Sequence, residues 1–133
     1  MNLEQAIHAR WAASPVLCQL LAADRLSTGL AKGTGTPYAT LSRKPGRTLF
    51  RTNAGDALDE VPLVFHLWHD RFDAGQAIVR QVHAVFDRSD FALSDGGHVV
   101  QMRRGGLSVV EHDDGVWLWA IEFSVHVYLP SGY

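Results

Sequence analysis

The chain has 133 residues, of which 47% are hydrophobic and 20% charged, so its length and apolar content predict one globular domain over residues 1–133 and exclude wholesale disorder. Its 12 Lys and Arg side chains nearly balance 14 Asp and Glu side chains, which argues against a general affinity for nucleic acid or an anionic membrane. The single cysteine, Cys18, excludes an internal disulfide and a zinc site built on paired cysteines. No signal-peptide pattern opens the chain and no apolar run approaches the roughly 20 residues of a membrane helix, so we expect a soluble protein from a reducing compartment, with no membrane partner.

Residues 3–23 carry apolar side chains at steps of three to five, the spacing of one face of a helix. Pro15 interrupts the pattern, because proline removes an amide donor and clashes with the preceding turn. We therefore expect either a kink at Pro15 or two short helices, with Ser14 capping the second. The glycines between residues 27 and 37 predict a loop.

A charged turn follows the first predicted strand. Residues 37–42 are typical of a short strand, and residues 43–47 form a turn with three cations. Residues 48–52 are predicted as the return strand of a hairpin. Residues 61–68 form a near-continuous run of β-branched and aromatic side chains, which predicts a buried strand.

The next elements are a helix and a β-hairpin. An amphipathic helix is predicted from residue 72 to about residue 88, with Asp73 as a cap or first-turn acid. Strands are predicted over residues 98–103 and 107–112, joined by a turn at residues 104–106.

The final strand is the clearest element of the sequence. The Asp-Asp-Gly at residues 113–115 predicts a tight turn. From residue 116 to residue 129, apolar side chains at odd positions alternate with mostly polar ones, and this length predicts a bulge or strong coiling. Together these elements predict an α+β domain, with two helices packed on one face of a mainly antiparallel sheet of four to five strands.

No group of side chains predicts catalysis, a cofactor or a metal. His66 and His69 would lie on opposite faces of a strand, and the triplet at residues 112–114 occupies the expected turn. Cys18 lies in a helical apolar stretch and is expected to be a small core residue. No serine occupies a nucleophile elbow, and no glycine-rich loop precedes a helix. We therefore expect neither an enzyme nor a bound cofactor or metal.

Two features stand above this background. The first is a charged segment, in which four cations are followed by acids, and which we interpret as a contact surface for another copy of the chain or for a polyanion. Its candidate contact residues are Arg43, Lys44, Arg47, Arg51, Asp56, Asp59 and Glu60. An ordinary solvated loop explains the same pattern. The second feature is the long aromatic final strand, since sheet edges and large apolar faces often form contacts between copies of one chain.

Other classes of protein remain open from the residues alone. A small α+β ligand-binding or enzymatic domain would have an apolar pocket between helix and sheet, lined by Trp68, Trp117 and Trp119. No polar side chains converge at these motifs to orient a ligand. A regulatory partner protein would need a nucleic-acid motif, and the sequence has none.

Several short motifs resemble, in their order along the chain, the tail-completion or tail-terminator proteins of long-tailed bacteriophages and prophages. The counterparts are a first helix followed by Ser-Pro, a Pro-Tyr strand, a strand ending in Trp, a helix start and a closing aromatic strand. They cover residues 3–15, 36–41, 64–68, 72–78 and 115–123. The order of elements matches over almost the whole chain, whereas residues 46–58 depart from the family's pattern.

This resemblance implies a structural protein of the virion tail, made in the bacterial cytoplasm and without enzymatic activity. Such proteins assemble as a ring, commonly a hexamer, at the head-proximal end of the tail tube. They stop tube polymerisation and join the tail to the head connector, so the tail-tube and head-connector proteins are the implied partners. Genomic DNA passes through the ring as a transient, non-specific neighbour.

Overall fold

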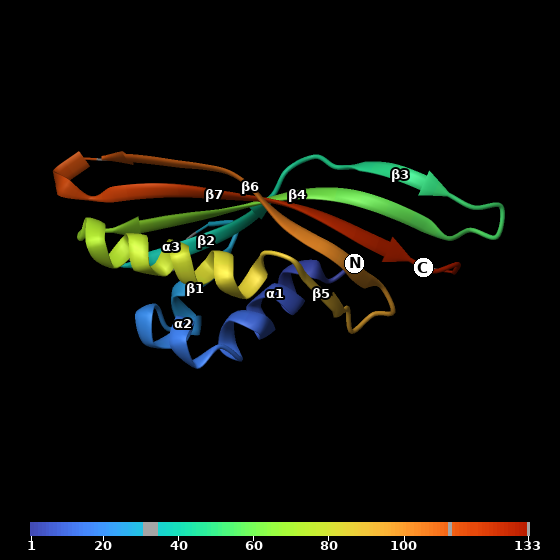
Figure 1. The fold of residues 1–133 in the computed structure, drawn as a ribbon, viewed down its shortest axis with the longest axis horizontal. Coiled ribbons are helices and arrows are strands. Elements are labelled where there is room, and N and C mark those ends of the chain that lie inside the picture. The colour runs from blue at the N-terminus through green and yellow to red at the C-terminus, as the bar shows by residue number, and fades with distance from the viewer. Residues whose placement is uncertain (31–34, 112, 133) are drawn as a thin grey trace.

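All helices of the described chain lie against one face of a twisted sheet (Figure 1). The computed structural model describes residues 1–30, 35–111 and 113–132. Its helices are α1 (Leu3–Ala12), α2 (Pro15–Leu20) and α3 (Phe72–Phe86), with 3₁₀ turns at Ala23–Arg25 and Asp113–Gly115. Its strands are β1 (Leu26–Thr28), β2 (Tyr38–Arg43), β3 (Arg47–Arg51), β4 (Ala57–His69), β5 (Ser89–Ala92), β6 (His98–Glu111) and β7 (Trp117–Leu129). None of the helices in these residues has the length and apolar character needed to cross a membrane.

The sheet is mixed and has seven strands within the described residues. Six strands follow the order β1-β2-β4-β7-β6-β5, and β3 pairs with β4 beyond the end of β2. β1 runs parallel to β2, whereas the other paired neighbours are antiparallel. The α+β class is confirmed, but the described chain has three helices and seven strands, so the expectation of two helices on a mainly antiparallel sheet of four to five strands is wrong. β1 and β5 have three and four residues, too few for a period-2 pattern to show in the sequence.

Pro15 divides the N-terminal helical region, which confirms the expectation of two short helices rather than a kink. α2 begins at Pro15, where the missing amide costs little because first-turn N–H groups have no partner within a helix. Ser14 caps α2 by accepting a hydrogen bond from the N–H of Leu17 at 3.3 Å. The loop predicted from residue 27 is wrong at its start, since residues 27 and 28 belong to β1, and residues 31–34 lie outside the described residues.

β2 and β3 follow each other in the chain and pair with different parts of the same strand, β4. β2 pairs with residues 63–68 of β4, and β3 pairs with residues 57–60 of the same strand. The predicted return strand therefore exists but does not lie beside β2. Gly46 permits this crossing, because a Cβ there would lie 2.3 Å from the carbonyl oxygen of Glu60. β4 begins four residues before the predicted strand, at Ala57, because its first residues pair with β3.

One long strand, β6, replaces the two strands predicted around residues 104–106. β6 pairs with β7 on both sides of this point, and the register shifts between Arg104 and Leu107. The predicted turn is wrong because the two glycines lie in a β-bulge, which bends a strand without ending it. The turn at the other end of β6 is confirmed, since Asp114 and Gly115 have φ angles of 59° and 74°.

The core lies between the helices and the odd-numbered side chains of β4 and β7. This confirms the alternation predicted for the final strand. The buried side chains of β7 are Trp119, Ile121, Phe123, Val125 and Val127. At the centre of the core, the ring of Phe65 lies 6.0 Å from that of Trp11, 5.4 Å from that of Phe86 and 5.8 Å from that of Phe123, measured between centroids. These aromatic contacts join α1 and α3 to the two central strands.

Candidate functional site

Five of the seven charged residues predicted as contacts line one polar hollow where β2 passes into β3. The hollow has a volume of about 340 Å³. Its charged lining residues are Arg43, Lys44, Arg47, Asp59 and Glu60. The other two, Arg51 and Asp56, lie further along the chain, at the end of β3 and in the turn to β4. The structure thus brings most of the charged segment together at the crossing between strands.

Arg43 connects this hollow to helix α1. Its guanidinium donates two hydrogen bonds to the carboxylate of Glu4, with Nε 2.6 Å from Oε2. Hydrogen bonding from Arg43 holds the pKa of the Glu4 carboxyl below its ordinary value, although partial burial opposes this effect. The charge of Arg43 therefore has a partner inside the chain.

The Glu4–Arg43 pair makes the stability of the fold depend on pH. Because the folded-state pKa of Glu4 is lowered, its contribution is present above the unfolded-state pKa and is lost as the pH falls through the folded-state pKa. Glu4→Gln is expected to lower the free energy of unfolding by about 0.5 kcal/mol at neutral pH, since both side chains are partly solvated. Urea unfolding at neutral pH and at the most acidic pH that preserves the fold measures this difference. An equal difference at both pH values would contradict the assignment.

The other two cations of the hollow are also paired. Lys44 Nζ forms an ion pair with the carboxylate of Glu122 on β7. Arg47 Nε lies 3.2 Å from Glu60 Oε1 on β4, and the second oxygen of Glu60 lies 3.4 Å from His126 Nε2. These pairs hold the β2–β3 crossing against β4 and β7, so the charged segment first stabilises its own part of the sheet.

The remaining charged residues of the segment differ in their surroundings. Asp56 Oδ1 accepts a hydrogen bond from the N–H of Ser131 at 2.7 Å, near the end of the chain. Asp59 Oδ1 is buried and has no hydrogen-bond partner among the described residues. Arg51 is exposed on β3, and its guanidinium forms no ion pair within the described ranges. Arg51 is therefore a cation available to a neighbouring molecule.

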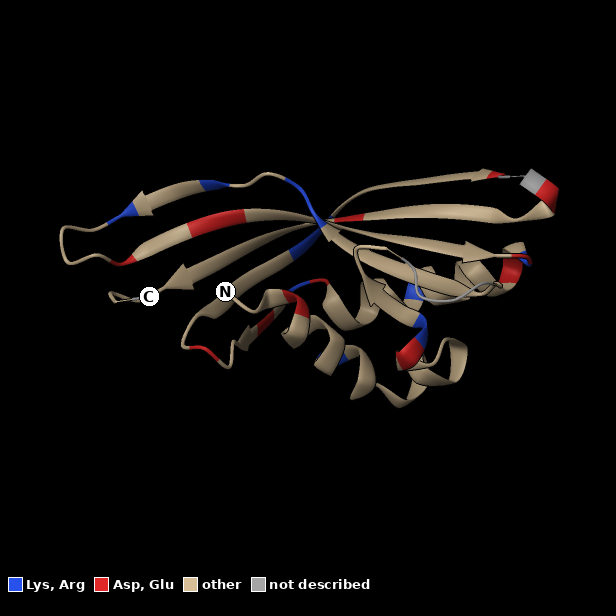
Figure 2. Cartoon of the chain, turned by 180° about the vertical axis from the view of Figure 1, so that it is seen from behind, with Lys and Arg blue, Asp and Glu red and all other residues tan. Residues whose placement is uncertain are grey.

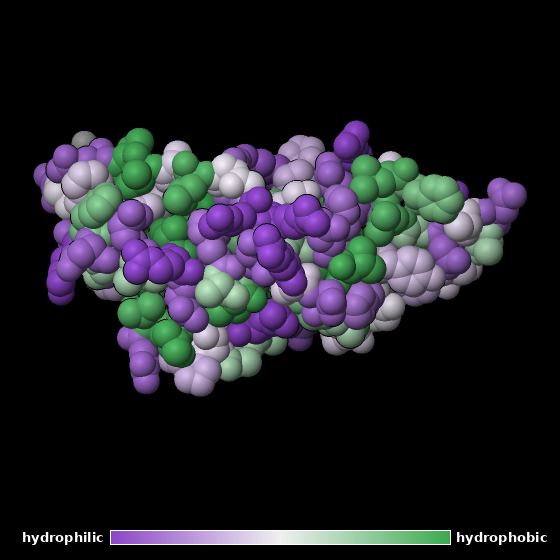
Figure 3. All heavy atoms as spheres, in the orientation of Figure 1, coloured by the Kyte–Doolittle hydropathy of each residue, from purple (hydrophilic) through white to green (hydrophobic). Residues whose placement is uncertain are grey.

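Two hairpin arms lie at opposite ends of the sheet (Figure 1). The β3–β4 arm comprises residues 47–60, and the β6–β7 arm comprises residues 107–111 and 113–121. All side chains of β3 are exposed, with Phe50 63% exposed, and Val110 on β6 is 52% exposed. Hydrophobic atoms show at the surface towards both ends of the molecule (Figure 3). The sequence analysis did not predict the exposure of the β6–β7 arm. A usable signal was present, because two predicted helices are too few to cover so long a strand.

Aromatic side chains also stack on the helix-free face of the sheet. The rings of Tyr38 and Trp68 stack with centroids 4.8 Å apart, and His66 lies 5.8 Å from Trp68. Burial lowers the pKa of His66, and the nearby Lys44 cation lowers it further. His69 is buried on the opposite face, as the strand period predicts. Across the described ranges, no three His, Cys, Asp or Glu side chains gather in a way that would hold a metal ion.

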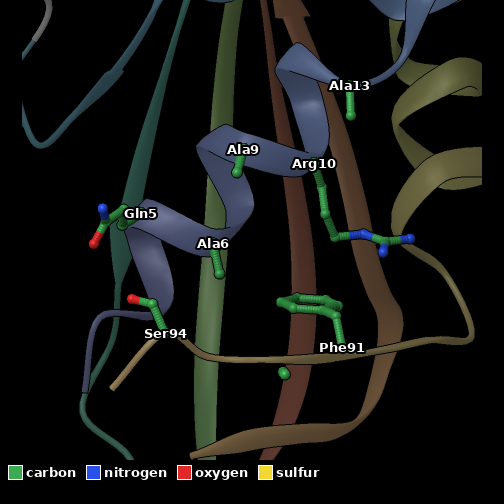
Figure 4. Close-up of a pocket in the computed structure, with 8 residues that line it drawn as sticks. Gln5, Ala6, Ala9, Arg10, Ala13, Phe91 and Ser94 are labelled. Atoms are coloured by element: carbon green, nitrogen blue, oxygen red, sulfur yellow. The ribbon is translucent and has the colours of Figure 1, made fainter. Parts of the chain in front are cut away.

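A second hollow lies between α1 and β5, and Figure 4 shows its lining. Its volume is about 340 Å³, and alanines of α1 such as Ala6 and Ala9 form one wall. The guanidinium of Arg10 lies 4.8 Å from the centre of the Phe91 ring and donates to the carbonyl oxygen of Val85 at 3.2 Å. The one cation in this hollow is therefore engaged within the chain.

The three tryptophans expected to line a helix–sheet pocket do not share one. Trp68 lies on the helix-free face, whereas Trp119 is buried in the core on the other face. Trp117 packs against Phe72 of α3, with ring centroids 5.0 Å apart. The predicted lining of a ligand pocket by these side chains is therefore wrong.

Comparison with known proteins adds independent observations. The sequence model of a family described as tail completion protein gp17 matches residues 5–128. Among solved structures, a chain from the "Virion of native gene transfer agent (GTA) particle" aligns with a TM-score of 0.76 and 17% sequence identity. This alignment covers 96% of the present chain and 95% of that chain, so the two share a fold. A search of the curated proteins found no match.

Proposed function

The chain belongs to the phage tail completion protein gp17 family, and on this premise we propose that it forms a ring at the head-proximal end of the tail tube. Membership of this family supports a structural role in the virion tail, and such a role requires no enzymatic activity. In this position the ring ends polymerisation of the tube and presents the surface that joins the tail to the head connector. Its partners are five further copies of itself, the tail-tube protein and the head-connector protein.

The observation that carries this proposal is the exposure of both hairpin arms. The helices leave β3 and the outer part of β6 uncovered, although α3 packs on Trp117 and Trp119 of the β6–β7 arm (Figure 1). Phe50 on one arm and Leu107, Val109 and Val110 on the other are 41–63% exposed. Burying such side chains against neighbouring copies is favourable, at about 25 cal/mol per Å² of apolar surface. Two separate exposed apolar surfaces on one chain allow head-to-tail contacts between copies, and such contacts support closed assembly into a ring.

The charged segment has a second role in this proposal. Its seven residues, assigned as oligomer or lumen contacts, are Arg43, Lys44, Arg47, Arg51, Asp56, Asp59 and Glu60. Four cations against three acids leave the group close to neutral. A near-neutral lumen suits the passage of DNA, because a strongly cationic channel would retain phosphates by counterion release. DNA is then a transient neighbour without sequence readout.

Reversing the charges of β3 tests the assembly. Arg47→Glu combined with Arg51→Glu is expected to leave the fold intact, because both side chains are exposed and the loss of a surface pair such as Arg47–Glu60 costs about 1 kcal/mol or less. The double variant should lower the yield of rings and of joined head–tail particles by about tenfold or more, since like charges at a contact cost several kcal/mol. Native mass spectrometry measures the rings, electron microscopy counts the particles, and circular dichroism checks the fold.

Arg80→Glu is the matched control, because Arg80 is exposed on α3 and belongs to neither arm. It should assemble as the wild type does. If the double variant formed rings and particles normally, the β3 arginines would not be part of the interface. A wild-type chain that stays monomeric, alone and with tail tubes, would contradict the ring itself.

A further inference from the structure

Two strands of the sheet have a long edge with no neighbour among the described residues. β4 is flanked on one side by β2 and β3, and the outer edge of β3 pairs with no described strand. On the far side of the sheet, β5 covers β6 only over residues 98–102. Residues 107–111 of β6 therefore pair with β7 on one side alone, and all their side chains are exposed, whereas the N–H of Arg104 donates to Asp87 Oδ1 at 3.0 Å. Such edges present unpaired N–H and C=O groups that a further strand can bind.

The two free edges are placed to meet in successive copies. They lie on opposite sides of the sheet, as the strand order shows, and on the two arms at opposite ends of the molecule (Figure 1). β3, β4, β7 and β6 alternate in direction. When sheets of identical chains lie edge to edge in the same orientation, β6 of one copy therefore runs antiparallel to β3 of the next. This is a head-to-tail contact, the type that can close a ring.

The two edges are also complementary in charge and in apolar character. β3 carries Arg47 and Arg51 without an acid, as the blue segments at its ends in Figure 2 show. From residue 107 to residue 111 the edge of β6 carries Glu111 and no Lys or Arg, and Asp114 follows in the turn. Both edges also bear exposed apolar side chains, including Phe50 on β3 and Val110 on β6. Neither β3 nor this part of β6 contains a proline that would block pairing.

We propose that the free edge of β6 in one copy pairs with the free edge of β3 in the next, so that one continuous sheet runs around the ring. The inference rests on the proposed ring and names its interface. Backbone hydrogen bonds between the strands supply the contact, and Phe50 and Val110, which face the same helix-free side, are buried across it. Glu111, at the end of β6, then lies near the arginines of β3.

Cysteine cross-linking between two separate variants tests this pairing. Phe50→Cys and Val110→Cys are made in a Cys18→Ala background, so that each chain carries one thiol. After mixing, disassembly and reassembly, a short-reach bismaleimide should give covalent dimers in the mixture and almost none in either variant alone. A chain with both cysteines should give a ladder that extends to the size of the ring. Arg80→Cys, paired with either variant, is the control and should give no dimers.

The outcomes separate this inference from the proposed function. If native mass spectrometry shows rings but the mixture of the two cysteine variants gives no cross-linked dimers, the pairing of β6 with β3 is wrong and the proposed ring is unaffected. Dimers within one variant alone would show a symmetric contact between like edges and would also overturn it. A wild-type chain without rings, alone or with tail tubes, would contradict both proposals.

Discussion

Phe65→Ala is expected to lower the free energy of unfolding by about 3–5 kcal/mol, the range for removing a buried phenylalanine. Phe65 is fully enclosed, and its ring contacts those of Trp11, Phe86 and Phe123, which come from three other elements. Alanine would leave a cavity at the point where α1, α3, β4 and β7 meet. Chemical unfolding of the purified chain, followed by tryptophan fluorescence and circular dichroism, measures the change.

Phe50→Ala is the matched control for this prediction. The same substitution on β3 removes a ring that is 63% exposed, so it should change the free energy of unfolding by less than about 0.5 kcal/mol. Its effect should appear in assembly instead. Similar stability losses from Phe65→Ala and Phe50→Ala would contradict the division between a core face and an exposed arm.

Gly75→Val is expected to destabilise the fold by about 3 kcal/mol or more, at the upper end of the range for overpacking. A Cβ at Gly75 would lie 2.1 Å from Cη2 of Trp119, well inside van der Waals contact. The indole has little freedom to move, because it is buried and its Nε1 donates to Gln76 Oε1 at 2.9 Å. Helix α3 would have to move away from β7, and thermal and urea unfolding would record the loss.

A second-site variant makes this prediction specific. In a Trp119→Leu background the space beside residue 75 opens. Gly75→Val should therefore lower the free energy of unfolding clearly less in that background than in the wild type. Ala74→Val, one position away and half-buried, should have a small effect. Additive losses in the double variant would show that the close contact between α3 and Trp119 is not the cause.

The elements with strong local signals could be predicted from the sequence. The alternation from Trp117 to Leu129 identified β7 and its buried face, because period-2 patterning depends only on neighbouring residues. The break at Pro15 and the turn at Asp114 follow from backbone chemistry at single positions. These features are local, so no knowledge of the tertiary structure was needed.

The errors concern elements whose partners lie far away in the sequence. β3 was correctly located but pairs with the start of β4, since Gly46 lets the chain cross over Glu60 instead of turning back beside β2. The glycines before Leu107 suggested a turn, whereas pairing with β7 on both sides keeps β6 continuous. Strand β1 is defined by its parallel pairing with β2 rather than by its own sequence.

The candidate site could be predicted as a cluster but not as a set of contacts. The charge run identified the segment, in which the cations that include Arg43 and Lys44 are followed by acids, but it named no ion-pair partners. Their actual partners, Glu4 and Glu122, lie 39 and 78 residues away in the sequence. Arg51 proved to be exposed and without an ion pair in the described chain, a distinction that depends on how β3 sits against β4.

The length of tail tubes tests the central claim most directly. Purified tail-tube protein is allowed to polymerise with and without this chain, and electron microscopy records the length and the ends of each tube. We expect the chain to stop growth, with a ring at one end of each tube, and the Arg80→Glu control to do the same. Tubes that grow to the same lengths with the chain as without it, and that carry no ring, would contradict the proposed role.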